Sequence, residues 1–302
     1  MSEDETFGRT IQLFLIDGTP TGLMVASIHG WTGSVLVATQ ATFGRLLARP
    51  ETDRAGIYIL HGPDPDRALG TRAYIGEADS VRERIVQSGK QRTFWESAIV
   101  VTTSDDALNK GHVRYLEARL IELARASGRA TLENGNDPLS DRRRLSEADR
   151  ANMEAFLANM KVVLPVVGVD LLKPPVGMVR AEAGSSLPPQ FEMRHKSGVK
   201  ALAAEQEGEF VVLAGSEALK DTGYVGTSYR ELKNELVSAG VLVPEDDPLR
   251  FARPYAFRSP SAAAAVVLDR SSNGRLEWKV VGSSANYDEW QQQKAGADVA
   301  TP

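Results

Sequence analysis

Two tyrosines and two charged residues in the first half of the chain carry the side chains that phosphodiester hydrolysis needs. Tyr58 ends a Gly-Ile-Tyr triplet, and Tyr74 begins a Tyr-Ile-Gly triplet. A tyrosine can take a proton, an arginine such as Arg84 can hold a charged phosphate, and a carboxylate such as Glu117 can bind a divalent cation. The glycines beside the two tyrosines would let another part of the backbone approach closely. A strand tyrosine is more often a packing residue, so each triplet alone is weak evidence.

Glu117 is placed by the periodicity of a helix that we expect over residues 112–126. At 100° per residue, Glu117 lies within about 40° of the centre of the apolar arc, whereas Glu122 lies on the opposite side. A carboxylate that faces the core is costly unless it is paired or binds a metal. The periodicity therefore leaves two readings for Glu117, which are an ion pair with a neighbouring arginine and a metal ligand.

Arg84 falls on the first turn of another expected helix. Ser80 followed by Glu83 fits a capping box, in which each side chain satisfies a free N–H of the first turn. Arg84 then lies opposite the apolar face of this helix and can point back over the strand end that carries Tyr74. A planar guanidinium there suits a phosphate.

Length and composition limit the class of protein. The 302 residues are enough for two modest domains, and the apolar fraction of 42% is ordinary for a globular protein. The chain has no cysteine, which excludes disulfides and thiolate catalysis. The acidic, polar start does not resemble a signal peptide, and the most apolar stretch is too short to span a bilayer. We expect a cytoplasmic protein without membrane association.

The net charge of −5 argues against a protein that coats nucleic acid without specificity, but it leaves room for a local basic surface. We predict nucleic-acid contacts at Arg82, Lys90 and Arg92. Further basic clusters occur at 142–144 and 194–200. A solvated surface is the alternative for each cluster.

Alternation and turn residues predict the elements that position these groups. Strands are expected at 11–16, 23–28, 34–38, 56–60, 72–75 and 98–103, and helices at 43–48, after Ser80, at 112–126 and from 146 to 160. The second half is expected to have strands at 210–213 and 277–280, helices at 227–239 and 260–268, and a turn at Asn273-Gly274. Residues 125–144 read as loop, and the proline-rich stretch 171–190 reads as a linker.

These elements predict an α/β (α+β) fold, in which a small three-stranded sheet is flanked by helices. A short β module precedes this core, and a second small α+β domain follows it. The expected parts are an N-terminal β-rich extension at 1–50, a core with the two triplets at 51–137, a connecting helix and linker at 138–190, a C-terminal domain at 191–282 and a disordered tail at 283–302.

The two triplets in this order, with Arg84 ten residues after Tyr74 and with Glu117 in the later helix, resemble the GIY-YIG endonucleases. The resemblance covers less than a third of the chain. It implies that Tyr58 is the general base or relay that activates water and that Tyr74 orients the water and the phosphate. It also implies that Arg84 stabilises the charge on the phosphate and that Glu117 is the one protein ligand of Mg²⁺ or Mn²⁺.

Two further positions match the family less well. The family carries an asparagine about fifteen residues after the glutamate, for which Asn134 is the nearest match and Asn136 the next. Many members have a histidine or tyrosine one helical turn after the arginine, whereas this chain has Ser88 there. The gap between the triplets is long, which places the loop at 61–69 beside the site.

Residues 191–280 resemble a domain of unknown function that often follows such nucleases. We interpret it as a module that binds the substrate or a protein partner and positions the nuclease core. The leading function is a metal-dependent endonuclease that hydrolyses DNA phosphodiester bonds. The alternatives are a noncatalytic module that kept the fold and binds nucleic acid or protein, and a nuclease that acts as a toxin or defence effector.

Overall fold

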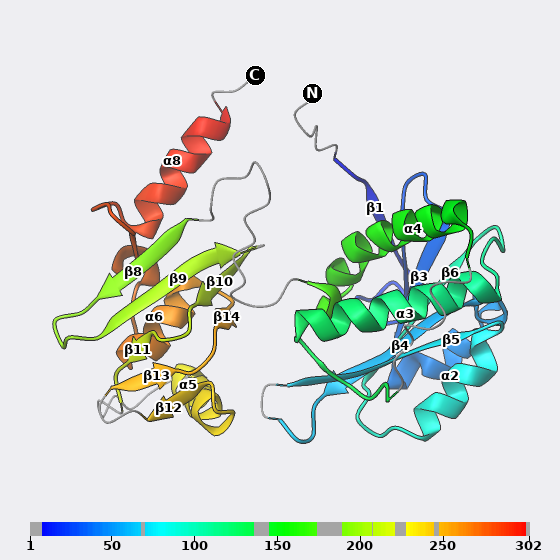
Figure 1. Cartoon of the computed structure of the whole chain (residues 1–302), viewed down its shortest axis with the longest axis horizontal. Helices are drawn as coiled ribbons and strands as arrows, with labels where there is room; N and C mark the ends of the chain where they lie inside the picture. The colour runs from blue at the N-terminus through cyan, green and yellow to red at the C-terminus, as the bar shows by residue number, and fades with distance from the viewer. Residues whose placement is uncertain are drawn as a thin grey trace. The chain divides into compact units, whose positions relative to one another are not determined.

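The computed structural model describes residues 8–67, 70–135, 145–173, 189–206, 208–220, 228–244 and 248–299. The chain divides into two compact units, residues 1–175 and 176–302, and each is described by itself below (Figure 1). The helices in these ranges include none with the length and apolar character needed to cross a membrane.

The first unit is built on one mixed sheet of seven strands. Their spatial order is β1 (Ile11–Leu15), β2 (Met24–Ile28), β3 (Gly33–Thr39), β6 (Ser97–Thr103), β4 (Gly56–Pro63), β5 (Thr71–Ala78) and β7 (Thr131–Leu132). Neighbouring strands are antiparallel except β5 and β7, which are parallel. The mixed α+β class expected from the sequence is confirmed.

The sheet is larger than the three strands expected from the sequence. Strands β4, β5 and β6 are adjacent as predicted, but β3 pairs with β6 along its whole length, from Gly33 opposite Thr103 to Thr39 opposite Ser97. The β-rich N-terminal stretch therefore continues the central sheet. The buried run Val35–Ala38 explains this, because a strand apolar on both faces belongs inside a sheet with helices on either side.

Helices cover both faces of the sheet. The helical segments of this unit are η1 (Gln40–Thr42), α1 (Phe43–Leu47), η2 (Pro50–Asp53), α2 (Val81–Lys90), α3 (Lys110–Ser127), α4 (Glu147–Val166) and η4 (Asp170–Leu172). Side chains of α3 and α4 pack on one face, and those of α1 and α2 pack on the other. Along β4, Ile57 and Ile59 face α3, and Tyr58 and Leu60 face α2, as strand alternation requires.

Several local expectations are corrected. Ser80 precedes α2, but its side chain makes no capping hydrogen bond, so the predicted capping box is absent. Helix α3 begins earlier than expected and is capped by Asn109, which accepts a hydrogen bond from the N–H of His112. The expected loop at 125–144 contains the end of α3 and the short strand β7, and its residues 136–144 lie outside the described ranges.

The connecting helix is confirmed and is longer than expected. Ser146 caps α4 by accepting a hydrogen bond from the N–H of Asp149, as predicted. The helix continues past Met160 to Val166, with Pro165 in its last turn. Most of the expected linker, residues 174–188, lies outside the described ranges.

The second unit has its own core and two small sheets. One sheet has the order β14 (Tyr255–Phe257), β10 (Glu209–Val212), β9 (Lys200–Gln206), β8 (Gln190–Arg194) and β15 (Lys279–Val280). The other has the order β11 (Glu217–Ala218), β13 (Leu249–Phe251) and β12 (Leu242–Pro244). The helices are α5 (Ser228–Ser238), α6 (Pro260–Leu268), α7 (Gly274–Glu277) and α8 (Tyr287–Val299). Trp278 is fully buried among them, and its indole N–H donates to the carbonyl of Pro260 at 3.1 Å.

Three expectations for this unit are wrong. Residues 287–299 of the expected disordered tail form helix α8, because Tyr287 and Trp290 pack against Phe191 of the core, with ring centroids 5.1 and 5.2 Å away. The expected strand at 277–280 is limited to residues 279–280. Asn273 does not form a hairpin turn but caps the short helix α7 by accepting from the N–H of Arg275.

Candidate active site

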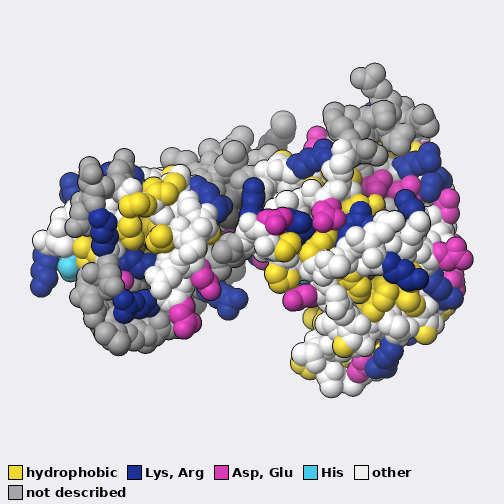
Figure 2. Space-filling view, turned by 90° about the horizontal axis from the view of Figure 1, so that it is seen from below, with side chains coloured by type: hydrophobic (Ala, Val, Ile, Leu, Met, Phe, Trp, Pro, Cys, Tyr) yellow, Lys and Arg dark blue, Asp and Glu magenta, His cyan; other side chains and the backbone are white. Residues whose placement is uncertain are grey.

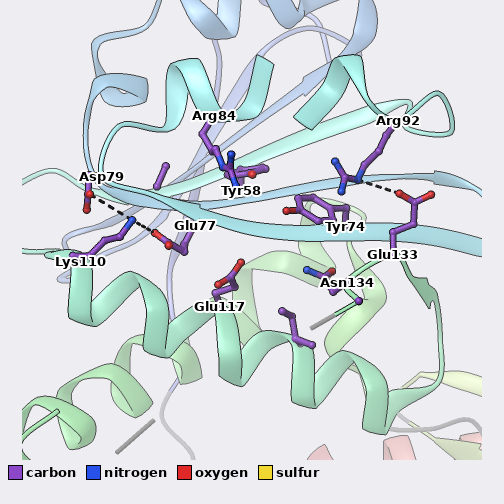
Figure 3. Close-up of a pocket in the computed structure, with 13 residues that line it drawn as sticks. Tyr58, Tyr74, Glu77, Asp79, Arg84, Arg92, Lys110, Glu117, Glu133 and Asn134 are labelled. Atoms are coloured by element: carbon purple, nitrogen blue, oxygen red, sulfur yellow. Dashed lines mark hydrogen bonds and ion pairs between the residues drawn. The ribbon is translucent and has the colours of Figure 1, made fainter. Parts of the chain in front are cut away.

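A cavity of about 530 Å³ lies at the edge of the first sheet, where β5 extends beyond its short neighbour β7. Helix α2 borders it on one side of the sheet and helix α3 on the other (Figure 3). The cavity is lined by Tyr58, Tyr74, Glu77, Ala78, Asp79, Arg84, Arg92, Lys110, Glu117, Ile121, Glu133, Asn134 and Gly135. It therefore brings together all five residues predicted as catalytic, which come from β4, β5, α2, α3 and the segment after β7.

The glycines of the two triplets have separate packing reasons. A Cβ at Gly76 would lie 2.3 Å from Cζ of Tyr58, because Tyr58 and Gly76 are direct partners across β4 and β5. A Cβ at Gly56 would lie 2.5 Å from the carbonyl oxygen of Val101 on β6. Only glycine fits at either position without displacing its neighbour. The Tyr58 ring thus owes its position in the cavity wall to the absence of a side chain at Gly76.

Tyr58 is fully buried, and its hydroxyl is within 2.8 Å of the hydroxyl of Ser88, one turn beyond Arg84 on α2. Burial raises the pKa of the Tyr58 phenol well above its usual value, and the hydrogen bond to Ser88 opposes this in part. Ser88 is also buried. The serine that stands where a proton-handling residue was expected is therefore the direct partner of Tyr58.

Tyr74 is half-buried, on the same face of the sheet as Tyr58, and their ring centroids are 6.1 Å apart. The guanidinium of Arg92 stacks on the Tyr74 ring, 3.4 Å from its centroid. The same guanidinium lies 3.1 Å from Glu133 and donates to the carbonyl of Ser88 at 3.1 Å. Arg92 thus connects α2, β5 and the segment after β7.

The three predicted nucleic-acid contacts lie in different places. Arg92 lines the cavity, but its side chain is only 14% exposed and is engaged within the protein. Arg82 lies outside this cavity and donates to Thr52 and Asp53, at 3.2 and 2.9 Å. Lys90 is exposed and shares a separate hollow with Arg82 along α2. The structure therefore does not gather these three cations into one basic patch.

Arg84 is exposed and reaches over the cavity from α2, close to Tyr58 (Figure 3). Its guanidinium donates to the side chain of Gln87 at 3.0 Å. Its positive charge also opposes the rise in the pKa of Tyr58. An exposed guanidinium at the mouth of a cavity is well placed for a phosphate.

Glu117 is half-buried on α3 and points toward the open edge of β5. Glu122, on the same helix, lies outside the cavity and pairs with Arg119. The helical periodicity correctly separated these two carboxylates. The periodicity could not show that the apolar face of α3 extends past the edge of the sheet. Glu117 lines a cavity for that reason.

Asn134 has a different environment from the one expected of a catalytic amide. Its side-chain N–H donates to the carbonyl of Ile75 at 2.6 Å, and its side-chain oxygen accepts from the N–H of Ile75 at 3.1 Å. These two bonds replace those of a neighbouring strand where β7 ends. Asn134 therefore fixes the edge of β5 directly beside Tyr74. Asn136, the other candidate, lies outside the described ranges.

Four charged residues of the cavity were not singled out from the sequence, which are Glu77, Asp79, Lys110 and Glu133. Lys110 lies 2.8 Å from Glu77 and 3.4 Å from Asp79. The position of Glu77 directly after the Tyr-Ile-Gly triplet could have indicated that it lines the site. Alternation along β5 turns its side chain toward α3, where Lys110 lies. On the face drawn in Figure 2, positive and negative side chains are interspersed over the first unit, consistent with a local rather than a broad basic surface.

The donor set of the cavity suits a cation that keeps most of its water. The described ranges contain no group of three histidine, aspartate or glutamate side chains that could share a metal ion. Mg²⁺ is commonly bound through one or two carboxylates, with waters and substrate phosphates completing its octahedron. Glu117, with a phosphate held near Arg84, fits that pattern, and Mn²⁺ has similar ligand preferences.

The geometry defines a mixed α/β unit with a polar, charged cavity at a sheet edge, followed by a separate α+β unit. A family model described as a domain of unknown function, DUF4357, matches residues 191–291, which begin in β8 and end in α8. The C-terminal resemblance expected from the sequence agrees with this match. Neither the curated proteins nor the solved structures contain a match to the chain.

Proposed function

We propose that the first unit is an endonuclease that hydrolyses DNA phosphodiester bonds with one divalent cation, as its resemblance to the GIY-YIG endonucleases implies. The observation that carries the proposal is the shared cavity. Two phenols, an exposed guanidinium and a half-buried carboxylate line one space of about 530 Å³, although they come from β4, β5, α2 and α3. A set assembled from four elements is harder to explain by packing alone than any one of its members.

In this proposal Arg84 binds a non-bridging oxygen of the scissile phosphate and offsets its charge. Tyr74 donates a hydrogen bond that orients the attacking water or the phosphate. Tyr58, in its phenolate form, accepts the proton of that water. The water oxygen forms the new P–O bond, one bridging P–O bond breaks, and the leaving oxygen is protonated by solvent.

Glu117 would hold Mg²⁺ or Mn²⁺, which when bound supplies positive charge beside the phosphate and favours the ionised form of nearby acids. Asn134 and Arg92 act as positioning residues. Asn134 holds β5 in place through Ile75, and Arg92 holds the Tyr74 ring. Ser88 orients the Tyr58 hydroxyl through their shared hydrogen bond.

Supercoiled plasmid incubated with the full chain and Mg²⁺ or Mn²⁺ tests the proposal. We expect nicked circles from the wild type and none from Glu117→Ala. Absence of nicking by the wild type in either metal, or equal nicking by Glu117→Ala, would reject it. Single-stranded DNA and RNA of the same sequence identify the substrate class in the same assay.

A noncatalytic module that binds nucleic acid or protein is the alternative. Full burial of Tyr58 favours this reading, since a packing tyrosine needs no access to substrate. Metal-independent binding of DNA without cleavage, unchanged by Glu117→Ala, would support it.

For the second unit we propose a role in binding the substrate or a protein partner. Its core is separate from that of the first unit, so a chain ending at residue 175 retains the core of the nuclease unit. We expect this shortened chain to keep cleavage and to bind DNA more weakly. Unchanged DNA affinity would exclude the substrate-binding role.

A further inference from the structure

Strand β1 forms one edge of the seven-stranded sheet, and its only neighbour among the described strands is β2 (Figure 1). The hydrogen bonds to β2 settle which main-chain groups are directed outward. The N–H of His29 donates to Thr10, and the N–H of Ile16 donates to Leu23. In an antiparallel pair such bonds involve every second residue. The N–H and C=O groups of the intervening residues Ile11, Leu13 and Leu15 therefore point toward the free edge.

The side chains of β1 are unusual for an edge strand. Phe14 is 64% exposed, the highest value among the large hydrophobic side chains of the described residues, and the adjacent Leu13 is 48% exposed. Leu13 and Phe14 project from opposite faces of the sheet, because adjacent residues of a strand alternate. Their partners on β2 are Ala26 and Val25. Natural edge strands are usually protected by a charge, a proline or a bulge, and β1, Ile-Gln-Leu-Phe-Leu, has no charged residue or proline.

We propose that β1 pairs antiparallel with β1 of a second copy of this chain, with Leu13 on the twofold axis. In this register Leu13 is opposite Leu13 of the second copy, Ile11 is opposite Leu15, and Gln12 is opposite Phe14. The outward main-chain groups of Ile11, Leu13 and Leu15 then all find partners. Apolar side chains become covered on both faces, and the two sheets become one.

Charge complementarity favours this register and a second copy as the occupant. The paired strands carry no charge, so no like charges oppose each other. Arg9, exposed just before β1, is brought to the end of the other strand where Asp17 lies, because both are four residues from Leu13. Within its own chain Arg9 donates to the side chain of Asn159 at 3.0 Å and Asp17 pairs with Arg45, so the match is one of charge sign at the strand ends and not of a new ion pair. A shift of two residues in either direction removes this match.

The absence of cysteine allows a direct test on the full chain. The twofold axis places residue 13 beside its own copy at the Cα separation that a disulfide accepts, about 5.5 Å. We expect mild oxidation to join most Leu13→Cys chains into covalent dimers. Leu202→Cys is the matched control, because Leu202 is 44% exposed on β9 in the other unit, and it should form no covalent dimer. Phe14→Cys should cross-link poorly alone and well when mixed with Gln12→Cys.

Light scattering after size exclusion provides a second measurement. We expect the wild type to elute at twice the mass of one chain, and Leu13→Lys to raise the dissociation constant at least about tenfold, because two lysines would meet on the axis. A wild type that stays monomeric at tens of micromolar would overturn the proposal. So would a dimer unaffected by Leu13→Lys, or equal cross-linking of Leu13→Cys and Leu202→Cys. These measurements need no nuclease activity.

Discussion

The hydroxyl groups of Tyr58 and Ser88 lie 2.8 Å apart in the wall of the cavity, in a place from which solvent is excluded. This contact joins the tyrosine proposed as the base to the helix that carries Arg84. Burial raises the pKa of this phenol more than the hydrogen bond to Ser88 lowers it, so the tyrosine assigned as base begins as a neutral phenol. The burial of Tyr58 therefore leads to a pH dependence that can be measured.

We predict that cleavage rises with pH through the neutral and mildly alkaline range without a plateau. Below its raised pKa, the phenolate fraction of Tyr58 increases tenfold for each pH unit, so the rate should rise by up to about tenfold per unit. Tyr58→Phe should abolish this rise and most of the activity. Tyr115→Phe is a suitable control, because Tyr115 is a buried tyrosine bonded to Glu154 outside the cavity. A plateau near neutral pH in the wild type would exclude Tyr58 as the base.

The same tyrosine should make the fold sensitive to alkali. Its pKa is higher in the folded chain than in the unfolded chain, so the folded state holds the proton more tightly. The resulting stability is complete below the unfolded pKa of about 10 and is lost as the pH rises through the folded pKa. Urea unfolding at pH 9 and at pH 11 should show a smaller loss of stability for Tyr58→Phe than for wild type. An equal loss in both would contradict the assignment.

Glu117 should be needed for cleavage but not for the fold. We predict that Glu117→Gln lowers the rate in Mg²⁺ by about 100-fold or more, because a ligand change costs at least as much as the 10- to 100-fold of an outer-shell change. Glu122→Gln on the same helix should retain wild-type activity, since Glu122 pairs with Arg119 outside the cavity. Calorimetric titration with Mn²⁺ provides a readout without substrate. Equal Mn²⁺ binding by the two variants would remove Glu117 as a ligand.

Much of the site could be predicted because its residues repeat the periodicity of the elements that carry them. Tyr58 and Tyr74 share a face of the sheet because Tyr58 is opposite Gly76, and Tyr74 is two residues before Gly76 on β5. Glu117 lies within the apolar arc of α3, as the helical periodicity predicted. The position of Asn134 could not be predicted, since it depends on where the two-residue strand β7 stops. Ser88 was noted only as a departure from the family pattern, because its contact with Tyr58 is a tertiary one.

The number of strands in the sheet could not be predicted from the sequence either, because it also depends on tertiary contacts. The strands at 11–38 were predicted, but local alternation does not say which strand accepts β3 as a neighbour. The helix α8 was mistaken for a disordered tail because its sequence is mostly polar. Only Tyr287 and Trp290, one turn apart, pack on Phe191, and two aromatic residues make a weak periodic signal.

Arg92 should act through Tyr74 and not through DNA. We predict that Arg92→Lys lowers kcat by about 10- to 100-fold, because the flat stack and the contact with Glu133 both depend on a guanidinium. The affinity for DNA in Ca²⁺ and its salt dependence should not change. Arg84→Gln should instead weaken binding and reduce the salt slope, to which one lost phosphate contact contributes about 0.9. If Arg92→Gln reduced the slope by that amount, Arg92 would be a phosphate contact.

Gly76 should be intolerant of even one added carbon. A Cβ there would lie 2.3 Å from Cζ of Tyr58, so the buried ring would have to shift from its place beside Ser88. We predict that Gly76→Ala destabilises the unit by about 1–3 kcal/mol and misplaces the Tyr58 hydroxyl relative to Ser88. Gly44→Ala is the matched control, because Gly44 lies in α1 with nothing within 4 Å of its added Cβ, and it should stabilise by about 0.5–1 kcal/mol. Urea unfolding distinguishes the two, and equal effects of the two substitutions would mean that the Tyr58 ring does not rest on Gly76.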